Sequence, residues 1–307
     1  MKRQLAVAGM AALVLAACSG DPTGLDNASD DDRDAVVAAL DASGWFTDAF
    51  GPDGAADDLN LSASFDLNLS SVAAQDTVPL LRRWGRRHGQ PVSRELTVSI
   101  SGDTARAEQV VTFDGVFVLD RTPDDDQPPT QKPLQEQAVQ RAVLVRREEP
   151  DSAGRAWRLV ALSPREWRMT DEAKRTVQLA RVVVRVNGEV KLAVEDPSEL
   201  FGVDNRIPRL EVGDSVAVLA EVENTTGIDN EPPTFVFLHV FHHGPDARGW
   251  VRIPMRRRDD GVFVRHWIVR FAGRERMVVD AIDSQAFNSD GDDDYRANGW
   301  GIPYRIE

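Results

Sequence analysis

Apolar and polar residues alternate along much of the first half of the chain, and a period of two is typical of a β-strand with one buried face. Residues 59–69 show it without exception, because every odd position is apolar and every even position is polar. Similar stretches follow residue 94 and are separated by turn sequences such as Ser101-Gly102-Asp103. These patterns predict antiparallel strands at residues 59–69, 95–100, 104–113, 116–119, 135–146 and 157–162.

Two stretches in the same region have the spacing of helices instead. Ser29 can cap a helix that carries an apolar stripe, and Gly44 can end it. A second helix is predicted from Pro79 to Gly89, with Trp84 on its apolar side. Its other side is strongly basic, with Arg82, Arg83, Arg86 and Arg87. We interpret this side as solvated, and the alternative is contact with lipid headgroups or an anionic ligand.

The second half of the chain has the pattern of a β-sandwich. Asn187-Gly188 and Asp260-Gly261 are typical two-residue hairpin turns. Strands are predicted at residues 177–186, 189–194, 215–222, 234–242, 249–254, 261–271 and 276–282. The stretch from Ala286 to Tyr304, rich in Asp, Gly and aromatic residues, is predicted to be a structured loop.

Together these elements predict an α+β N-terminal domain, with helices on a strongly bent antiparallel sheet, followed by an all-β sandwich. Residues 29–165, which end in Trp157-Arg158-Leu159-Val160-Ala161-Leu162-Ser163, resemble the nuclear-transport-factor-like cone fold. Residues 172–307 resemble an immunoglobulin-like sandwich without its disulfide, since the chain has one Cys. The predicted division is a signal peptide at 1–17, a tether at 18–28, a cone-like domain at 29–165, a connector at 166–174 and a sandwich at 175–307.

The most specific motif lies at the N-terminus. A short basic start precedes an apolar run that is too short to span a bilayer, as in a signal peptide. The run ends in Leu15-Ala16-Ala17-Cys18, which resembles the lipobox of bacterial lipoproteins. The resemblance implies that Cys18 carries acyl chains such as palmitate and anchors the mature protein in the cell envelope. Ser19 resembles the residue found in lipoproteins of the outer membrane, in organisms that have one.

The charge balance narrows the choice of partners. The 307 residues include 36 Lys and Arg against 50 Asp and Glu, for a net charge of -14. Binding to nucleic acid needs clustered basic groups that neutralise phosphates, so we expect no nucleic-acid partner. Much of the negative charge is local, because residues 21–58 contain eleven Asp and the single Arg33.

One acidic cluster has the spacing of a calcium site. Asp290, Asp292 and Asp294 match the first three ligand positions of an EF-hand loop. Tyr295 then replaces the turn glycine, and Gly301 stands where the bidentate Glu would be. The cluster is therefore either an irregular calcium site or an acidic surface loop. We predict no other cofactor.

The histidines give no metal site of their own. On a strand, His239 and His243 would lie about 13 Å apart, and zinc bonds near 2 Å do not bridge that distance. His242 would point to the other face. A metal site would need partners from elsewhere in the chain, and we interpret the histidines as paired or exposed side chains at a strand end.

These observations leave two functional hypotheses. The first is an envelope lipoprotein that acts without catalysis, as an interaction or ligand-binding protein, with the bilayer and a protein or small molecule as partners. The alternative is an enzyme or small-molecule carrier that uses the pocket of the cone-like domain. No catalytic residue can be assigned, because His88 is the only His of that domain and lies at a predicted helix end. The ligand-binding residues are unknown, and the interior of the domain decides between the hypotheses.

Overall fold

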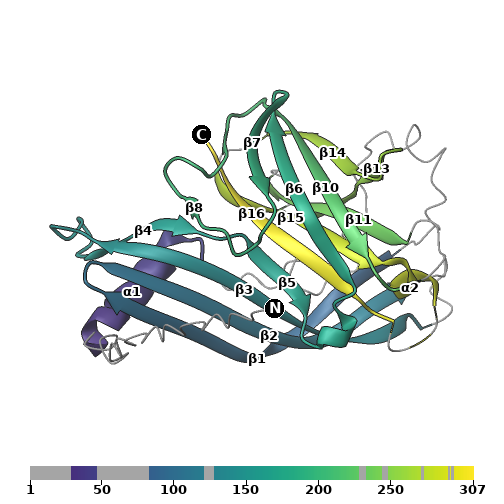
Figure 1. The fold of residues 1–307 in the computed structure, drawn as a ribbon, viewed down its shortest axis with the longest axis horizontal. Coiled ribbons are helices and arrows are strands. Elements are labelled where there is room, and N and C mark those ends of the chain that lie inside the picture. Colours follow the sequence, from purple (N-terminus) through teal and green to yellow (C-terminus); the bar gives the residue numbers. More distant parts are fainter. Residues whose placement is uncertain are drawn as a thin grey trace, which may run out of the picture.

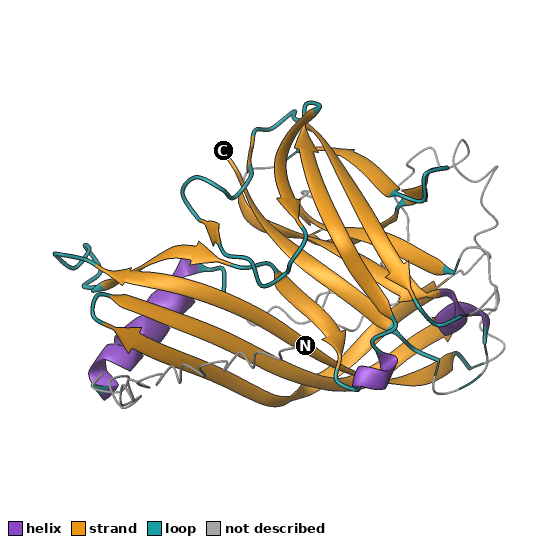
Figure 2. Ribbon diagram, in the orientation of Figure 1, coloured by secondary structure: helices purple, strands orange, loops and turns teal. Residues whose placement is uncertain are grey.

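The computed structural model describes residues 29–46, 83–120, 128–227, 233–243, 248–270, 273–289, 291 and 294–307. These residues are mostly β-structure in two sheets, and nearly all strand pairs are antiparallel (Figure 2). The larger sheet contains β1 (Arg83–Ser101), β2 (Thr104–Asp120), β3 (Thr130–Arg146), β4 (Trp157–Leu162), β5 (Arg165–Met169), β8 (Phe201–Gly202), β9 (Arg209–Leu210), β11 (Thr234–His243), β12 (Arg248–Pro254), β15 (Gly273–Asp283) and β16 (Ala297–Ile306). The smaller sheet contains β6 (Val177–Val186), β7 (Glu189–Val194), β10 (Ser215–Asn224), β13 (Arg256–Arg257) and β14 (Phe263–Ile268).

The larger sheet runs through both halves of the chain, in the order β1-β2-β3-β5-β16-β15-β11-β12. Its first three strands are long hairpins that curve along their length (Figure 1). The pairing of β1 with β2 shifts register between His88 and Ser93, and such bulges bend a strand. N-terminal and C-terminal strands thus share one sheet.

The smaller sheet has the order β13-β14-β10-β6-β7 and packs one face against β15 and β16. Its hairpin turn is confirmed, because Asn187 and Gly188 have φ angles of 51° and 87°. All seven strands predicted in this half are present, although β11, β12 and β15 belong to the larger sheet. The core between the sheets includes Val182, Val184, Val216, Val218, Val279, Trp300 and Ile302.

The first predicted helix is confirmed as α1 (Asp30–Ser43). The Ser29 side chain accepts a hydrogen bond from the backbone of Asp32, and Gly44 ends the helix at φ 71°. Val36 and Leu40 are buried in the core that also includes residues of β3 and β4. An ion pair of 2.9 Å between Asp32 and Arg146 ties the helix to the end of β3.

The second predicted helix is wrong over its described residues 83–89, which begin β1. Trp84 and Arg86 are buried, while Gly85 and Arg87 between them are partly exposed. This stretch therefore has a period of two, and pairing with β2 decides its conformation. Residues 79–82 of the prediction lie outside the described residues.

The predicted loop from Ala286 to Tyr304 is also wrong. Part of it is α2 (Ser284–Asn288), and its end is β16, between β5 and β15. β16 is buried on both faces over residues 297–304, so its sequence shows no alternation. Gly301 is required for packing, because a Cβ there would lie 2.8 Å from the ring of Trp167.

The predicted connector at 166–174 contains most of β5 and the short 3-10 helix η4 (Glu172–Lys174). β5 pairs with β3 on one side and β16 on the other, so regular structure replaces the expected loop. The division into two domains stays a prediction. The strand predicted at 59–69 lies outside the described residues. Among the helices that are described, none has both the length and the apolar composition to cross a bilayer.

Candidate functional site

The two end strands of the larger sheet approach each other through side chains. Arg252 on β12 donates a hydrogen bond of 2.6 Å to the backbone carbonyl of Trp84 on β1. Its guanidinium carbon also lies 3.4 Å from the centre of the Trp84 ring, in a cation–π contact. The curved hairpins therefore close over β11 and β15, and the side chains between them form the candidate site.

Arg86 on β1 lies at the centre of this site. Its two terminal nitrogens donate to both carboxylate oxygens of Asp280 on β15, at 2.7 and 2.8 Å. Such a bidentate pair has the fixed fork geometry that makes arginine–carboxylate contacts strong. His239 on β11 lies 3.2 Å from the same carboxylate, measured from Nε2 to Oδ2. Strands from opposite ends of the chain are thus joined by charged groups.

A second carboxylate, Glu136 on β3, completes the cluster. The Tyr295 hydroxyl donates to Glu136 at 2.6 Å and also accepts a hydrogen bond from Nε of Arg86. On the other oxygen, Nε2 of His88 lies 3.0 Å away. We call these six residues the buried ionic cluster: Arg86, His88, Glu136, His239, Asp280 and Tyr295.

The surroundings shift the pKa values of the acids in the buried ionic cluster. Burial raises the pKa of Asp280, but the Arg86 charge and the hydrogen bonds outweigh it and hold that pKa well below its usual range. The pKa of Glu136 is lowered by the same balance, with Arg86 and His88 against burial. Burial and the neighbouring carboxylates raise the pKa of the Tyr295 hydroxyl well above its usual value, against the opposing effect of Arg86. The cluster therefore favours two ionised carboxylates and a neutral phenol.

Aromatic rings fill the space beside the cluster. Phe287 of α2 packs against Trp84 and Phe117 at centroid distances of 5.2 and 5.3 Å, both edge-on. The ring of Tyr295 lies 5.1 Å from that of Phe117. Tyr295 therefore contacts the aromatic side chains with its ring and the charged side chains with its hydroxyl. This second core also includes Leu119, Leu134, Met169, Phe235, Phe237, Ile282, Ala286 and Ala297.

A histidine beside a carboxylate is the arrangement of a general base, and the cluster contains two such pairs. However, the side chains of His239 and Asp280 are each 1% exposed, and those of His88 and Glu136 are 2% and 3% exposed. The charged groups contact one another, and aromatic rings occupy the adjoining space. This geometry stabilises the closed sheet and does not present the imidazoles to a substrate.

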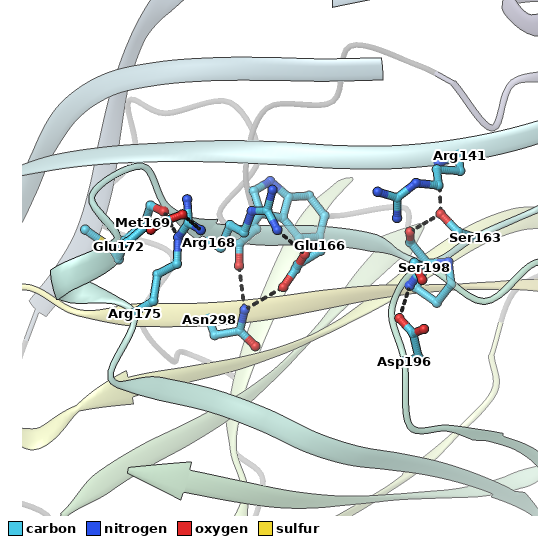
Figure 3. A network of polar contacts seen from close by, with 12 residues as sticks. Arg141, Ser163, Glu166, Arg168, Met169, Glu172, Arg175, Asp196, Ser198 and Asn298 are labelled. Carbon is cyan, nitrogen blue, oxygen red and sulfur yellow. Dashed lines mark hydrogen bonds and ion pairs between the residues drawn. The ribbon is translucent and has the colours of Figure 1, made fainter. Parts of the chain in front are cut away.

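A second polar network joins the two sheets near β5 (Figure 3). Asn298 on β16 accepts from the backbone of Leu179 on β6 and donates to the carbonyl of Trp167, at 3.0 and 3.1 Å. Its amide nitrogen also lies 3.4 Å from the Glu166 carboxylate. Burial raises the pKa of Glu166, and the charge of Arg168 opposes this shift. Asn298 on β16 thus connects its own strand to β5 and β6, and we interpret this network as holding the two sheets together.

The calcium prediction is neither confirmed nor contradicted. Asp290 and Asp292 lie outside the described residues, and Asp294 accepts a hydrogen bond from the Ser289 hydroxyl. The buried ammonium of Lys132 donates to the carbonyls of Gln285 and Ser289, at 3.2 and 2.7 Å. A cation of the chain itself thus lies next to the predicted loop. Within the described ranges, no three His, Cys, Asp or Glu side chains form a metal-binding group.

Of the other residues considered from the sequence, His88 and His239 both belong to the buried ionic cluster, and His88 lies on β1 and not at a helix end. His242 and His243 are on β11, and Cys18 lies outside the described residues. The chain matches no family model, no curated protein and no solved structure.

The buried ionic cluster predicts a stability profile with two pH limits. The lowered pKa values of Asp280 and Glu136 favour folding above their usual values of 3.8 and 4.5, and this contribution is lost as pH falls below them. The raised pKa of Tyr295 favours folding up to its usual value of 10.0, and this contribution is lost as pH rises further. Thermal melting from pH 3 to pH 11 should show both limits. Tyr295→Phe should weaken the alkaline limit, and an unchanged alkaline limit would contradict the assignment.

Proposed function

We propose that this protein is a lipid-anchored envelope lipoprotein that works by binding a partner at its outer surface and not by catalysis. One observation carries the second part of the proposal. The interior between the curved hairpins and β11 and β15 is occupied by the buried ionic cluster and by packed aromatic rings. Binding at the outer surface is therefore favoured over binding inside the fold.

The fold proposed for this function keeps its two parts. Residues 29–165 form the cone-like part, in which α1 packs on bent hairpins, and residues 175–307 form the sandwich that serves as docking module. An irregular calcium site at Asp290, Asp292 and Asp294 remains part of the proposal. In organisms with an outer membrane, Ser19 supports sorting to that membrane.

The enzyme or carrier hypothesis is the second candidate, and the two histidine–carboxylate pairs support it. It requires the curved hairpins to separate from β11 and β15, so that His88 and His239 reach solvent. The bidentate contact between Arg86 and Asp280 opposes this separation. We therefore place this hypothesis second.

The anchor is tested by changing the lipidation residue. We expect Cys18→Ala to leave the chain unprocessed or to release it from the membrane fraction, because the thiol is the acceptor of the lipid. Fractionation and intact-mass spectrometry measure both outcomes, and two acyl chains are needed for stable anchoring. Ser19→Asp is the matched control, which should keep the lipid and move the protein to the inner membrane of a two-membrane organism. If Cys18→Ala has the wild-type mass shift and fractionation, the protein is not a lipoprotein.

A further inference from the structure

The smaller sheet has one face that the rest of the described chain leaves uncovered. Its inner side chains, such as Val182 and Val218, belong to the core against β15 and β16. The opposite side chains of the same strands point away from that core. We call this surface the outer face, and it consists of Arg181, Val183 and Arg185 on β6, Ala217, Leu219, Glu221 and Glu223 on β10, and Val264, His266 and Ile268 on β14.

The middle of the outer face is apolar. Leu219 lies between Val183 on β6 and Val264 on β14, because these residues pair in register. Ala193 on β7 extends the row on the other side of Val183. At one end of the face, Ile268 is 52% exposed. Val183 is 8% exposed, while Leu219, Val264 and Ala193 are partly exposed. An apolar row among polar residues is typical of the centre of a protein interface.

The two ends of the outer face carry opposite charges. At one end, Arg185 and His266 flank Ala217 in register and are both exposed. Within the described part of the chain, neither makes a side-chain hydrogen bond or ion pair. The guanidinium of Arg185 is therefore available to a partner.

At the other end, acids outnumber bases. Arg181 lies between two carboxylates, 3.2 Å from Glu195 and 3.5 Å from Glu221. Glu223 is exposed two residues further along β10. Two carboxylates thus share one guanidinium and a third is exposed beside them, so this end of the face is negative.

We propose that the outer face binds the outer face of a second copy of this chain. In this dimer the outer faces of the two copies pack against each other. A two-fold axis runs between the two faces, perpendicular to the strands, so the strands of one copy run opposite to those of the other. It brings the apolar rows together and places the positive end of each copy over the negative end of the other. Arg185 then falls over Arg181 of the second copy, between Glu195 and Glu221, where two carboxylates outweigh one guanidinium, and the same contact is made twice. Arg256 on β13 pairs with Val264 and is exposed at the margin of the face.

A face that carries both charges fits its own copy better than it fits a membrane. An anionic bilayer would attract Arg185 but would repel Glu221 and Glu223 on the same surface. The inference goes beyond the proposed function, and its test does not require the lipid.

The test reverses one charge at each end of the face. The full chain in detergent should sediment as a dimer, and Arg185→Glu or Glu221→Arg should each raise the dissociation constant at least about tenfold through like-charge contacts. A mixture of the two variants should recover the dimer, because each new charge then meets its opposite. Arg158→Glu is the control, since its exposed pair with Asp204 lies on another surface, and it should sediment as the wild type. Far-ultraviolet circular dichroism establishes that each variant is folded.

Four results would overturn the inference. Three of them are a wild-type chain that is monomeric at all concentrations, a dimer that both charge reversals leave intact, and a mixture that fails to restore association. A fourth is a Cys18→Ala chain that binds phosphatidylglycerol vesicles through Arg185 and remains monomeric. If Cys18 is not lipidated but the mixture of variants associates, the proposed dimer is supported and the proposed lipid anchor is rejected.

Discussion

Asp280→Asn should lower the free energy of unfolding by about 3–5 kcal/mol, because it leaves the buried guanidinium of Arg86 without its bidentate partner. Both side chains are 1% exposed, so water does not replace the lost charge. Nε of Arg86 keeps Glu136 at 3.5 Å, which bounds the loss. Chemical denaturation followed by tryptophan fluorescence gives the change, provided that the slope with denaturant is the same for both proteins.

The control for this prediction is an ion pair with a single contact at the surface. Arg158 and Asp204 lie 3.3 Å apart with side chains 50% and 62% exposed, so Asp204→Asn should change stability by less than about 1 kcal/mol. The double variant Arg86→Met with Asp280→Leu should lose less than the sum of the two single changes, because neither charge remains unpaired. Equal losses for Asp280→Asn and Asp204→Asn would show that the buried ionic cluster does not hold the sheet closed.

Most strands of the C-terminal half were predictable, because each is a short apolar run and hairpin turns such as Asn187-Gly188 mark where the strands end. The helix α1 was predictable for the same reason, since its cap at Ser29 and its end at Gly44 are local signals. Errors arose where the conformation depends on distant partners. β1 is a strand because β2 pairs with it, and β16 loses its alternation because both of its faces are buried.

The buried ionic cluster was missed because its members are distant in sequence. Arg86 is 194 residues from Asp280 and 209 from Tyr295. One signal was present, since Asp280 interrupts the apolar run Met277-Val278-Val279 and Ala281-Ile282, and an acid within a buried strand needs a partner. The sequence does not identify that partner, because 36 basic residues were available.

Phe287→Ala should lower the free energy of unfolding by about 3–5 kcal/mol, since Phe287 is 1% exposed. Among the described residues, its ring meets those of Trp84, Phe117, Phe235 and Phe237. The loss combines the missing apolar burial with the cavity left between β1 and β11, because packed neighbours refill such a space only partly. Phe287→Leu is the matched control, and it should lose clearly less because most of the volume remains. Equal losses for the two variants would show that the ring does not fill this interior.

The same variants separate the two functional hypotheses. Anilinonaphthalene sulfonate becomes fluorescent on exposed apolar surface, so the wild-type dimer, with its interior filled and its outer faces paired, should leave the dye dark. Phe287→Ala should bind the dye as the closure of β1 over β11 loosens, and Phe287→Leu should not. If the folded wild-type protein binds one dye molecule per chain, and Phe287→Ala raises this affinity, the interior is a pocket. The higher affinity of Phe287→Ala would mean that the Phe287 side chain limits the size of this pocket. The carrier hypothesis would then replace the hypothesis of binding at the outer surface.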